Sequence, residues 1–195
     1  FDLVGTLIYS AALSCAMYGV SWLPAAMGTW LLLVGLLGLL AFVAWELRVP
    51  HPVLEVQLFT GNAVFAFSNL AALINYSSTF AVTFLLSLYL QYIRGMSPQG
   101  AGLILVAQPL IMSIFSPLAG RLSDRIEPRT VASTGMGFTM VALGVLTFLD
   151  GQSGVGFIVS CLLLNGFGFA LFSSPNTNAV MSSVDRRVYG VASAT

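Results

Sequence analysis

The residues best placed for ionic chemistry form a charged loop between two apolar segments. The loop, residues 116–129, contains Gly120, Asp124, Arg125 and Arg129. Asp124 could pair with either arginine, or accept hydrogen bonds from a helix N-terminus, where a carboxylate gains about 0.3–1 kcal/mol. Gly120, at the end of the preceding helix, would let a neighbouring helix approach closely. We predict a latch that holds one conformation and releases another; the alternative is that the arginines only set the topology.

Uncharged polar, aromatic and methionine side chains recur at helical spacing in three apolar segments. They are Asn69, Tyr76 and Thr83; Gln108, Met112 and Phe115; and Asn165, Phe169, Phe172 and Asn176. Each set shares one helical face. A cavity for amphiphilic organic molecules needs this mixture, because it gives adaptable contacts. The alternative is ordinary packing with interhelical hydrogen bonds, worth about 0.6 kcal/mol per polar contact.

Ionisable residues are absent from the middle of these apolar segments. An intramembrane enzyme is therefore not predicted: the single histidine, His51, lies in a linker between prolines, and no His, Asp or Glu constellation occurs within the segments. No metal or cofactor site is predicted either.

Glu46 is the acidic residue nearest to the middle of a span, and its place at a helix end predicts an interfacial side chain. Cys15 and Cys161 lie in apolar segments and are interpreted as packing residues.

The composition indicates that lipid is the main solvent of this chain. Of its 195 residues, 57% are hydrophobic and 7% are charged, whereas a soluble domain has about 25% charged residues. So few charges could not cover the surface of a water-soluble fold of this size. The formal net charge of zero also argues against a nucleic-acid partner, since no basic patch exists to contact phosphates.

Six apolar segments are each close to the ~20 residues that cross a ~30 Å hydrocarbon core. They cover residues 3–23, 30–47, 63–91, 101–122, 131–149 and 156–181. Because backbone groups in lipid must be paired internally, we read them as helices. The sequence therefore predicts an all-α, polytopic transmembrane protein with about six spans.

Prolines and glycines interrupt this pattern at particular places. Pro109 and Pro117 in the fourth span, and Pro175 in the sixth, are expected to free backbone carbonyls and permit kinks. Three glycines of the fifth span are expected to allow close helix packing; they are Gly135, Gly137 and Gly144.

The arginines predict an orientation in the membrane. If Asp2 lies on the cytoplasmic side, six of the seven arginines do too, as the positive-inside bias expects, and Arg94 lies opposite with Asp150. The six are Arg48, Arg121, Arg125, Arg129, Arg186 and Arg187. We predict a multi-pass protein of the cell membrane with both ends of this chain cytoplasmic.

The loop signature resembles one found in a known family of transporters. Gly120-x-Leu122-x-Asp124-Arg125 followed by Arg129 is similar to the Gly-x-Leu-x-Asp-Arg-x-Gly-Arg-Arg/Lys loop of the major facilitator superfamily. Glu127 stands where glycine is usual and Pro128 where arginine is usual. Degenerate copies of this kind are common in the second half of such transporters.

Further motifs resemble the fourteen-span drug:proton antiporter group of that superfamily. They are Phe1-Asp2-x-x-Gly5; Trp45-Glu46-x-Arg48-x-x-His51-Pro52 with Leu58-Phe59; Tyr89-Leu90-Gln91 with Gly95-x-Ser97-Pro98; and Gly166–Phe169, Pro175-Asn176-x-Asn178 and Gly190-x-Ala192-Ser193. The resemblance implies a central hairpin over residues 1–50, a cytoplasmic linker over 51–62, and an incomplete bundle of four spans over 63–195. The chain, which begins with Phe1 rather than Met, is expected to be a piece of a larger protein.

The function that this resemblance implies is proton-coupled efflux of hydrophobic drugs or related small molecules. The substrate would bind near the membrane midplane between the two halves of the transporter, and the coupling carboxylate is expected in the half outside this chain. The implied partners are the bilayer, a small hydrophobic substrate, protons and the remaining helices of the parent chain. The alternative is a membrane scaffold or sensor that kept the helices and lost transport.

Overall fold

The computed structural model describes residues 2–49, 52–185 and 189–193, and all regular structure among them is helical. Four residues used above lie outside the described residues: Phe1, His51, Arg186 and Arg187. Within the described part, six helical segments are long and apolar enough to cross a membrane. They are Leu3–Ser21, Ala26–Glu46, Ala63–Ile93, Pro98–Ser123, Pro128–Leu146 and Val155–Ser182. The prediction of an all-α protein with six candidate spans is confirmed.

Two compact units make up the chain. The first contains the residues up to Ala66 together with those from Val184 onward, and the second runs from Phe67 to Ser183. The first unit holds α1 (Leu3–Ser21), α2 (Ala26–Glu46), α3 (Val56–Gly61) and α9 (Tyr189–Ala192). The helix α4 (Ala63–Leu88) begins in the first unit and continues into the second. The short α3 forms within the segment that the sequence predicts as a linker.

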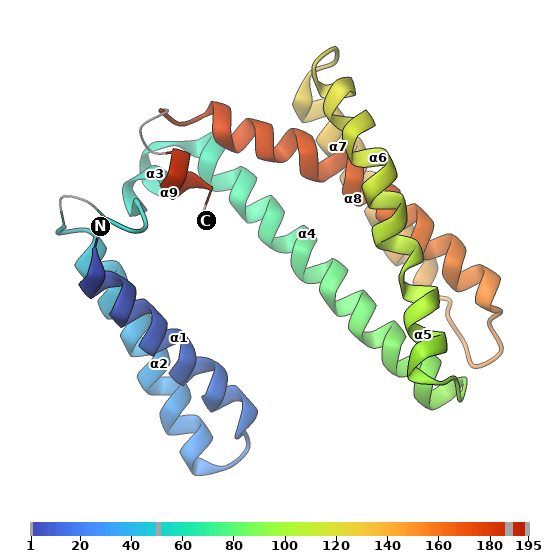
Figure 1. Ribbon diagram of the computed structural model, residues 1–195, viewed down its shortest axis with the longest axis horizontal. Helices are drawn as coiled ribbons and strands as arrows, with labels where there is room; N and C mark the ends of the chain where they lie inside the picture. The colour runs from blue at the N-terminus through green and yellow to red at the C-terminus, as the bar shows by residue number, and fades with distance from the viewer. Residues whose placement is uncertain (1, 50–51, 186–188, 194–195) are drawn as a thin grey trace. The chain divides into compact units, whose positions relative to one another are not determined.

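In the first unit, α1 and α2 form an antiparallel hairpin (Figure 1). Small residues bring the two backbones together: a Cβ built on Gly35 would lie 2.7 Å from Ala16 Cα, and one on Gly28 would lie 2.8 Å from Gly19 O. Such close approach gains van der Waals contact, which drives helix association in lipid. The helix α2 begins at Ala26, one turn before the expected start, and Gly28 in this additional turn contacts α1.

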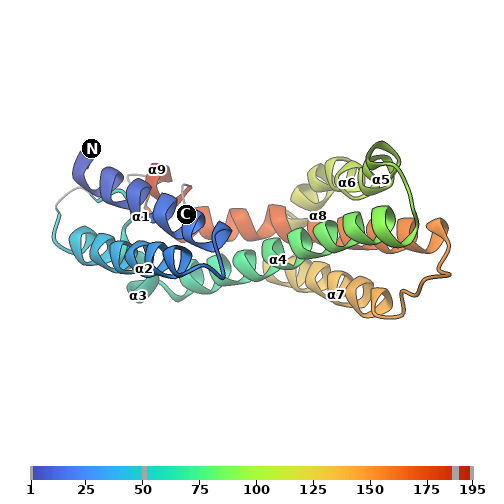
Figure 2. The ribbon, with the colours of Figure 1, turned by 90° about the horizontal axis from the view of Figure 1, so that it is seen from below.

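The second unit is built around α8 (Val155–Ser182). Its other helices are η1 (Tyr89–Ile93, a π-helix), α5 (Pro98–Leu105), α6 (Ala107–Ser123) and α7 (Pro128–Leu146). Figure 2 shows α8 between α6 and α7. Accordingly, α8 is the most buried of the six candidate spans, as expected for a helix that is apolar on all sides.

Glycines set the distance between α8 and its two neighbours. A Cβ built on Gly166 would lie 2.6 Å from Gln108 O of α6, and one on Gly168 would lie 2.7 Å from Gly135 O of α7. The expected role of Gly135 in close packing is therefore confirmed. Built Cβ atoms on Gly137 and Gly144 meet no atom within 4 Å, so the structure does not bring another helix against these two.

At one end of the second unit, hydrogen bonds join η1 and its C-cap residue Arg94 to the loop after α7. The Tyr89 hydroxyl donates to Asp150 O, and Arg94 Nη1 donates to Gly151 O over 3.3 Å. Arg94, the exception to the arginine asymmetry, thus has a structural partner. Bonds from Ser153 Oγ at 2.7 Å and from the Gln152 N–H at 3.0 Å hold the pKa of the Asp150 carboxyl below its ordinary value.

Candidate functional site

A cavity of about 350 Å³ lies in the second unit, between α4 and the pair α5–α6. Its lining residues are Thr79, Thr83, Gly102, Leu105, Val106, Gln108, Pro109 and Met112. None of these eight carries a charge. Ligand pockets in proteins commonly measure 300–1,000 Å³ and combine apolar walls with a few polar groups. The size and lining of this cavity fit a small organic molecule.

A proline-induced break shapes one wall of the cavity. Pro109 has no N–H to donate to the carbonyl of Leu105, and its ring would clash with that carbonyl in a regular helix. The helix accordingly stops at Leu105, turns at Val106 and resumes at Ala107 as α6. Both residues beside the break, Leu105 and Val106, line the cavity. The predicted irregularity at Pro109 is thus part of the cavity wall.

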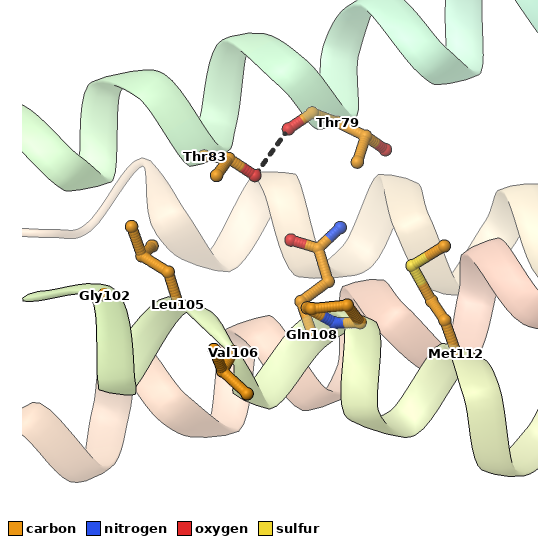
Figure 3. A pocket seen from close by; sticks show the side chains of 8 residues that line it. Thr79, Thr83, Gly102, Leu105, Val106, Gln108 and Met112 are labelled. Carbon is orange, nitrogen blue, oxygen red and sulfur yellow. Dashed lines mark hydrogen bonds between the residues drawn. The ribbon is translucent and has the colours of Figure 1, made fainter.

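Polar groups approach the cavity from both walls (Figure 3). On α4, the Thr83 hydroxyl donates to Thr79 O over 3.0 Å, and Thr79 Oγ1 is buried with no hydrogen-bond partner. On α6, the Gln108 amide points toward these threonines, and the residue is only 3% exposed. Buried polar groups normally find a partner. The Thr79 hydroxyl is thus a buried polar group beside the cavity that lacks a hydrogen-bond partner.

Three of the ten predicted cavity residues, Thr83, Gln108 and Met112, line this cavity. Three others, Asn69, Tyr76 and Phe115, lie on α4 and α6 and do not line it. Asn69 is half-buried on α4. Tyr76 is 52% exposed and packs edge-on against Phe169, with ring centroids 5.0 Å apart. Phe115 packs in the same way against Phe167, also at 5.0 Å.

The four predicted residues of α8 lie in the packed interior of the second unit. They are Asn165, Phe169, Phe172 and Asn176, each no more than 9% exposed. Asn176 Nδ2 donates to Ser68 O over 3.2 Å and so joins α8 to α4. Both polar atoms of the Asn165 side chain are buried without a partner. For Phe169, Phe172 and Asn176, these contacts favour packing over a place in the cavity wall.

Asn75 and Thr79 are not among the residues predicted to line a cavity. Asn75 is 2% exposed and its Oδ1 has no partner, while Thr79 lines the cavity. Asn75, Thr79 and Thr83 are spaced i, i+4, i+8, which places them on one helical face. This i, i+4, i+8 spacing in the sequence could have indicated that Asn75 and Thr79 share a face with Thr83. The prediction instead used the heptad spacing of Asn69, Tyr76 and Thr83, which defines a neighbouring face of the same helix.

The charged loop joins α6 to α7. It lies at the start of α7, whereas the Tyr89–Asp150 bond lies beyond the end of α7. A Cβ built on Gly120 would lie 3.1 Å from Ser174 Oγ, so α8 does approach the helix closely there. Asp124 is the C-cap residue of α6, and its side chain is exposed, as are those of Arg125 and Arg129. A carboxylate at a helix C-terminus is disfavoured by the helix dipole. The dipole of its own helix therefore does not stabilise the Asp124 carboxylate.

Residues that could hold a metal ion do not cluster in the described part of the chain: no group of three or more His, Cys, Asp or Glu occurs there. The cavity between α4 and α5–α6 offers neutral polar groups, aliphatic side chains and a thioether.

Comparison with known proteins gives the family. Residues 3–195 match the Major Facilitator Superfamily. Relatives include the "Riboflavin transporter RibZ" of Clostridioides difficile, 28% identical over 97% of this chain and 41% of the relative. The "Tetracenomycin C resistance and export protein" of Streptomyces glaucescens is 29% identical over 98% of this chain and 36% of the relative. The "Multidrug resistance protein Stp" of Mycobacterium tuberculosis is 29% identical over 99% of this chain and 36% of the relative.

The chain thus spans about two fifths or less of the length of these relatives. The match nevertheless covers nearly the whole chain, and it agrees with the six candidate spans. This chain belongs to the major facilitator superfamily.

Proposed function

We propose that this chain forms part of a secondary active transporter that binds small hydrophobic or amphiphilic molecules in the cavity between α4 and α5–α6. The superfamily consists of membrane transporters and not of enzymes. The observation that carries the proposal is the uncharged cavity of about 350 Å³ with Thr83, Gln108 and Met112 in its wall. Such a wall suits substrates whose binding depends on shape and apolar surface, with a few hydrogen bonds for orientation.

The direction and coupling that we propose are proton-coupled efflux of drugs or similar compounds. Two of the relatives named above are called resistance proteins, one of them for the export of tetracenomycin C, and a third is called a riboflavin transporter. All three names describe the handling of organic molecules. A scaffold or sensor without transport activity is the alternative. A scaffold would not need a ligand-sized cavity, whereas a sensor would, so transport itself separates the sensor from the transporter.

The place of the chain within the whole protein is also part of the proposal. Residues 1–50 would form a central hairpin, 51–62 a cytoplasmic linker, and 63–195 four helices of the second half of a fourteen-span transporter. The arginine asymmetry supports an orientation with both ends of this chain in the cytoplasm. The remaining helices of the parent chain would supply the other wall of the substrate site.

In this orientation the loop with Gly120, Asp124, Arg125 and Arg129 would lie at the cytoplasmic gate. The exposed Asp124, at the unfavourable end of its own helix, is suited to pair with a cation or a helix N-terminus in one conformation and to separate in the other. This supports the latch rather than a purely topological role for the loop.

A transport assay on the full-length protein tests the proposed function. The protein would be reconstituted into liposomes, and a proton gradient imposed across the membrane. We expect the gradient to drive movement of at least one of ethidium, tetracenomycin C and riboflavin, and we expect collapse of the gradient to stop it. Liposomes without protein provide the control. If no compound moves, the proposed transport is wrong: a compound that still raises the thermal stability of the protein would then point to a sensor, and none that does so would point to a scaffold.

A further inference from the structure

The hydrogen-bonding groups of the cavity between α4 and α5–α6 are more specific than the binding of apolar molecules requires. Three of its eight lining residues have polar side chains, namely Thr79, Thr83 and Gln108. The other five offer aliphatic surface, a glycine and one thioether. In such a site the few polar groups fix the orientation of the ligand and determine which ligand is preferred.

Gln108 has the side chain with the largest hydrogen-bonding capacity in this cavity. Its amide places an acceptor oxygen and a donor nitrogen side by side. Figure 3 shows both ends of the amide pointing toward Thr79 and Thr83, with no hydrogen bond between the amide and any other residue drawn. The residue is almost fully buried, and a buried amide without partners is costly. A ligand that supplies both missing bonds is therefore favoured.

The backbone that carries this amide is held in place from two directions. A Cβ built on Gly166 would lie 2.6 Å from Gln108 O and 3.3 Å from Gln108 Cα, so α8 packs directly against the α6 backbone at this residue. The next residue, Pro109, has its φ angle fixed by its ring. A binding group on a rigid support loses less conformational freedom when a ligand binds.

The facing wall on α4 is also neutral. The Thr83 hydroxyl donates its proton to Thr79 O over 3.0 Å, so its oxygen keeps only the capacity to accept. The Thr79 hydroxyl, buried without a partner, is of a kind that both donates and accepts. None of the eight residues that line the cavity is acidic, basic or aromatic. An organic cation thus finds neither a carboxylate nor an aromatic face in this lining, and an anion finds no arginine or lysine.

A neutral molecular edge that carries a carbonyl group next to an N–H matches the Gln108 amide. The ligand N–H would donate to the Gln108 oxygen, and the Gln108 N–H would donate to the ligand carbonyl. Glutamine side chains bind the donor–acceptor edge of adenine by two parallel bonds in this way. Because the amide can turn over, either order of donor and acceptor on the ligand can be paired.

We propose that Gln108 is the binding site for a neutral amide or cyclic imide edge of the transported compound. The rest of the compound would lie against the aliphatic side chains and Met112. This inference rests on the proposed function, because it names the class of molecule that the cavity accepts. A compound without such an edge leaves the buried Gln108 amide unpaired, and sites that hydrogen-bond an N–H reject analogues that lack it.

A pair of fluorescent probes that differ by one methyl group tests this proposal on the full-length protein in detergent. Naphthalimide is a flat, neutral molecule whose cyclic imide N–H lies between two carbonyl groups, and N-methylnaphthalimide lacks that N–H. By fluorescence titration, we expect the wild type to bind naphthalimide about tenfold more tightly, or better. Equal affinities for the two probes would overturn the proposal, and so would the absence of binding by either.

Gln108→Met separates hydrogen bonding from the size of the added methyl group. Methionine is an unbranched, flexible side chain without the amide, so this variant is expected to bind both probes alike. A preference that came from a clash of the methyl group would persist in it and would overturn the proposal. Gln91→Met is the matched control: Gln91 Nε2 donates to Ser87 Oγ over 2.9 Å, and Gln91 does not line the cavity. It should keep the preference of the wild type.

The comparison of the two probes on the wild type decides the matter even if Gln108→Met does not fold. Because the readout is binding, a failure here is distinct from a failure of the proposed function. Equal probe affinities together with transport in the liposome assay would overturn the Gln108 site and leave the transporter. A preference for naphthalimide without transport of any compound would support the site and point to a sensor.

Discussion

A Gly168→Ala variant of the full-length protein is expected to unfold at a clearly lower temperature than the wild type. The added Cβ would lie 2.7 Å from both Gly135 O and Thr139 N, and 2.8 Å from Thr139 Oγ1. Two of these three atoms belong to the backbone of α7, so they move only if the helices separate. Overpacking of this kind costs about 1–3 kcal/mol. Three simultaneous contacts point to the upper end, which exceeds the about 1 kcal/mol that alanine gains over glycine in a helix.

Gly137→Ala is the matched control for this prediction. It makes the same substitution on α7, but its Cβ meets no atom within 4 Å. We therefore expect Gly137→Ala to be as stable as the wild type or slightly more stable. Thermal unfolding in detergent measures both variants. Equal unfolding temperatures for Gly168→Ala and Gly137→Ala would show that the α7–α8 contact is not as close as described.

A Thr83→Phe variant is expected to lose at least tenfold in the affinity of the full-length protein for its transported compound. Thr83 lines the cavity between α4 and α5–α6, and an aromatic ring there would occupy the space of the ligand. A tenfold loss corresponds to about 1.4 kcal/mol, and an obstructed site readily loses this much. The measurement is the concentration dependence of transport in the liposome assay.

Thr134→Phe separates this effect from a general loss of structure. The Thr134 hydroxyl donates to Thr130 O over 2.8 Å, just as the Thr83 hydroxyl donates to Thr79 O over 3.0 Å. Both substitutions remove the same kind of bond and place the same side chain on a helix, but Thr134 is exposed on α7 and does not line the cavity. Thr134→Phe should transport like the wild type. Similar losses in both variants would contradict the assignment of the cavity.

The spans could be predicted from the sequence because they depend on local properties. Length and apolar composition decide whether a segment can cross a bilayer, and the break before Ala107 follows from the missing N–H of Pro109. The start of α2 at Ala26 could not be predicted in this way. The additional first turn contains Gly28, whose contact with Gly19 joins residues from different helices.

The lining of the candidate cavity was only partly predictable, because it also depends on contacts between different helices. Helical spacing shows which residues share a face, but it does not show which face meets another helix. Gly166 sets the contact of α8 with α6, and this contact accompanies the burial of Asn165 and Phe169 in the interior. Glu46 is likewise buried by residues outside α2. Asp2 and Gly5 lie at the start of α1, and Leu54, whose N–H donates to Glu46 Oε2, lies beyond the end of α2. No periodicity of α2 alone indicates this burial.

The central claim is that the cavity between α4 and α5–α6 holds the transported compound, and protection of a single cysteine tests it most directly. Met112→Cys places a thiol in the cavity wall, and Ser113→Cys places one on the next residue, which is exposed and does not line the cavity. Each would be made in the full-length protein after removal of its other cysteines, including Cys15 and Cys161. We predict that a saturating transported compound slows alkylation at position 112 at least severalfold and leaves position 113 unchanged. Equal alkylation rates at position 112 with and without the compound would contradict the claim.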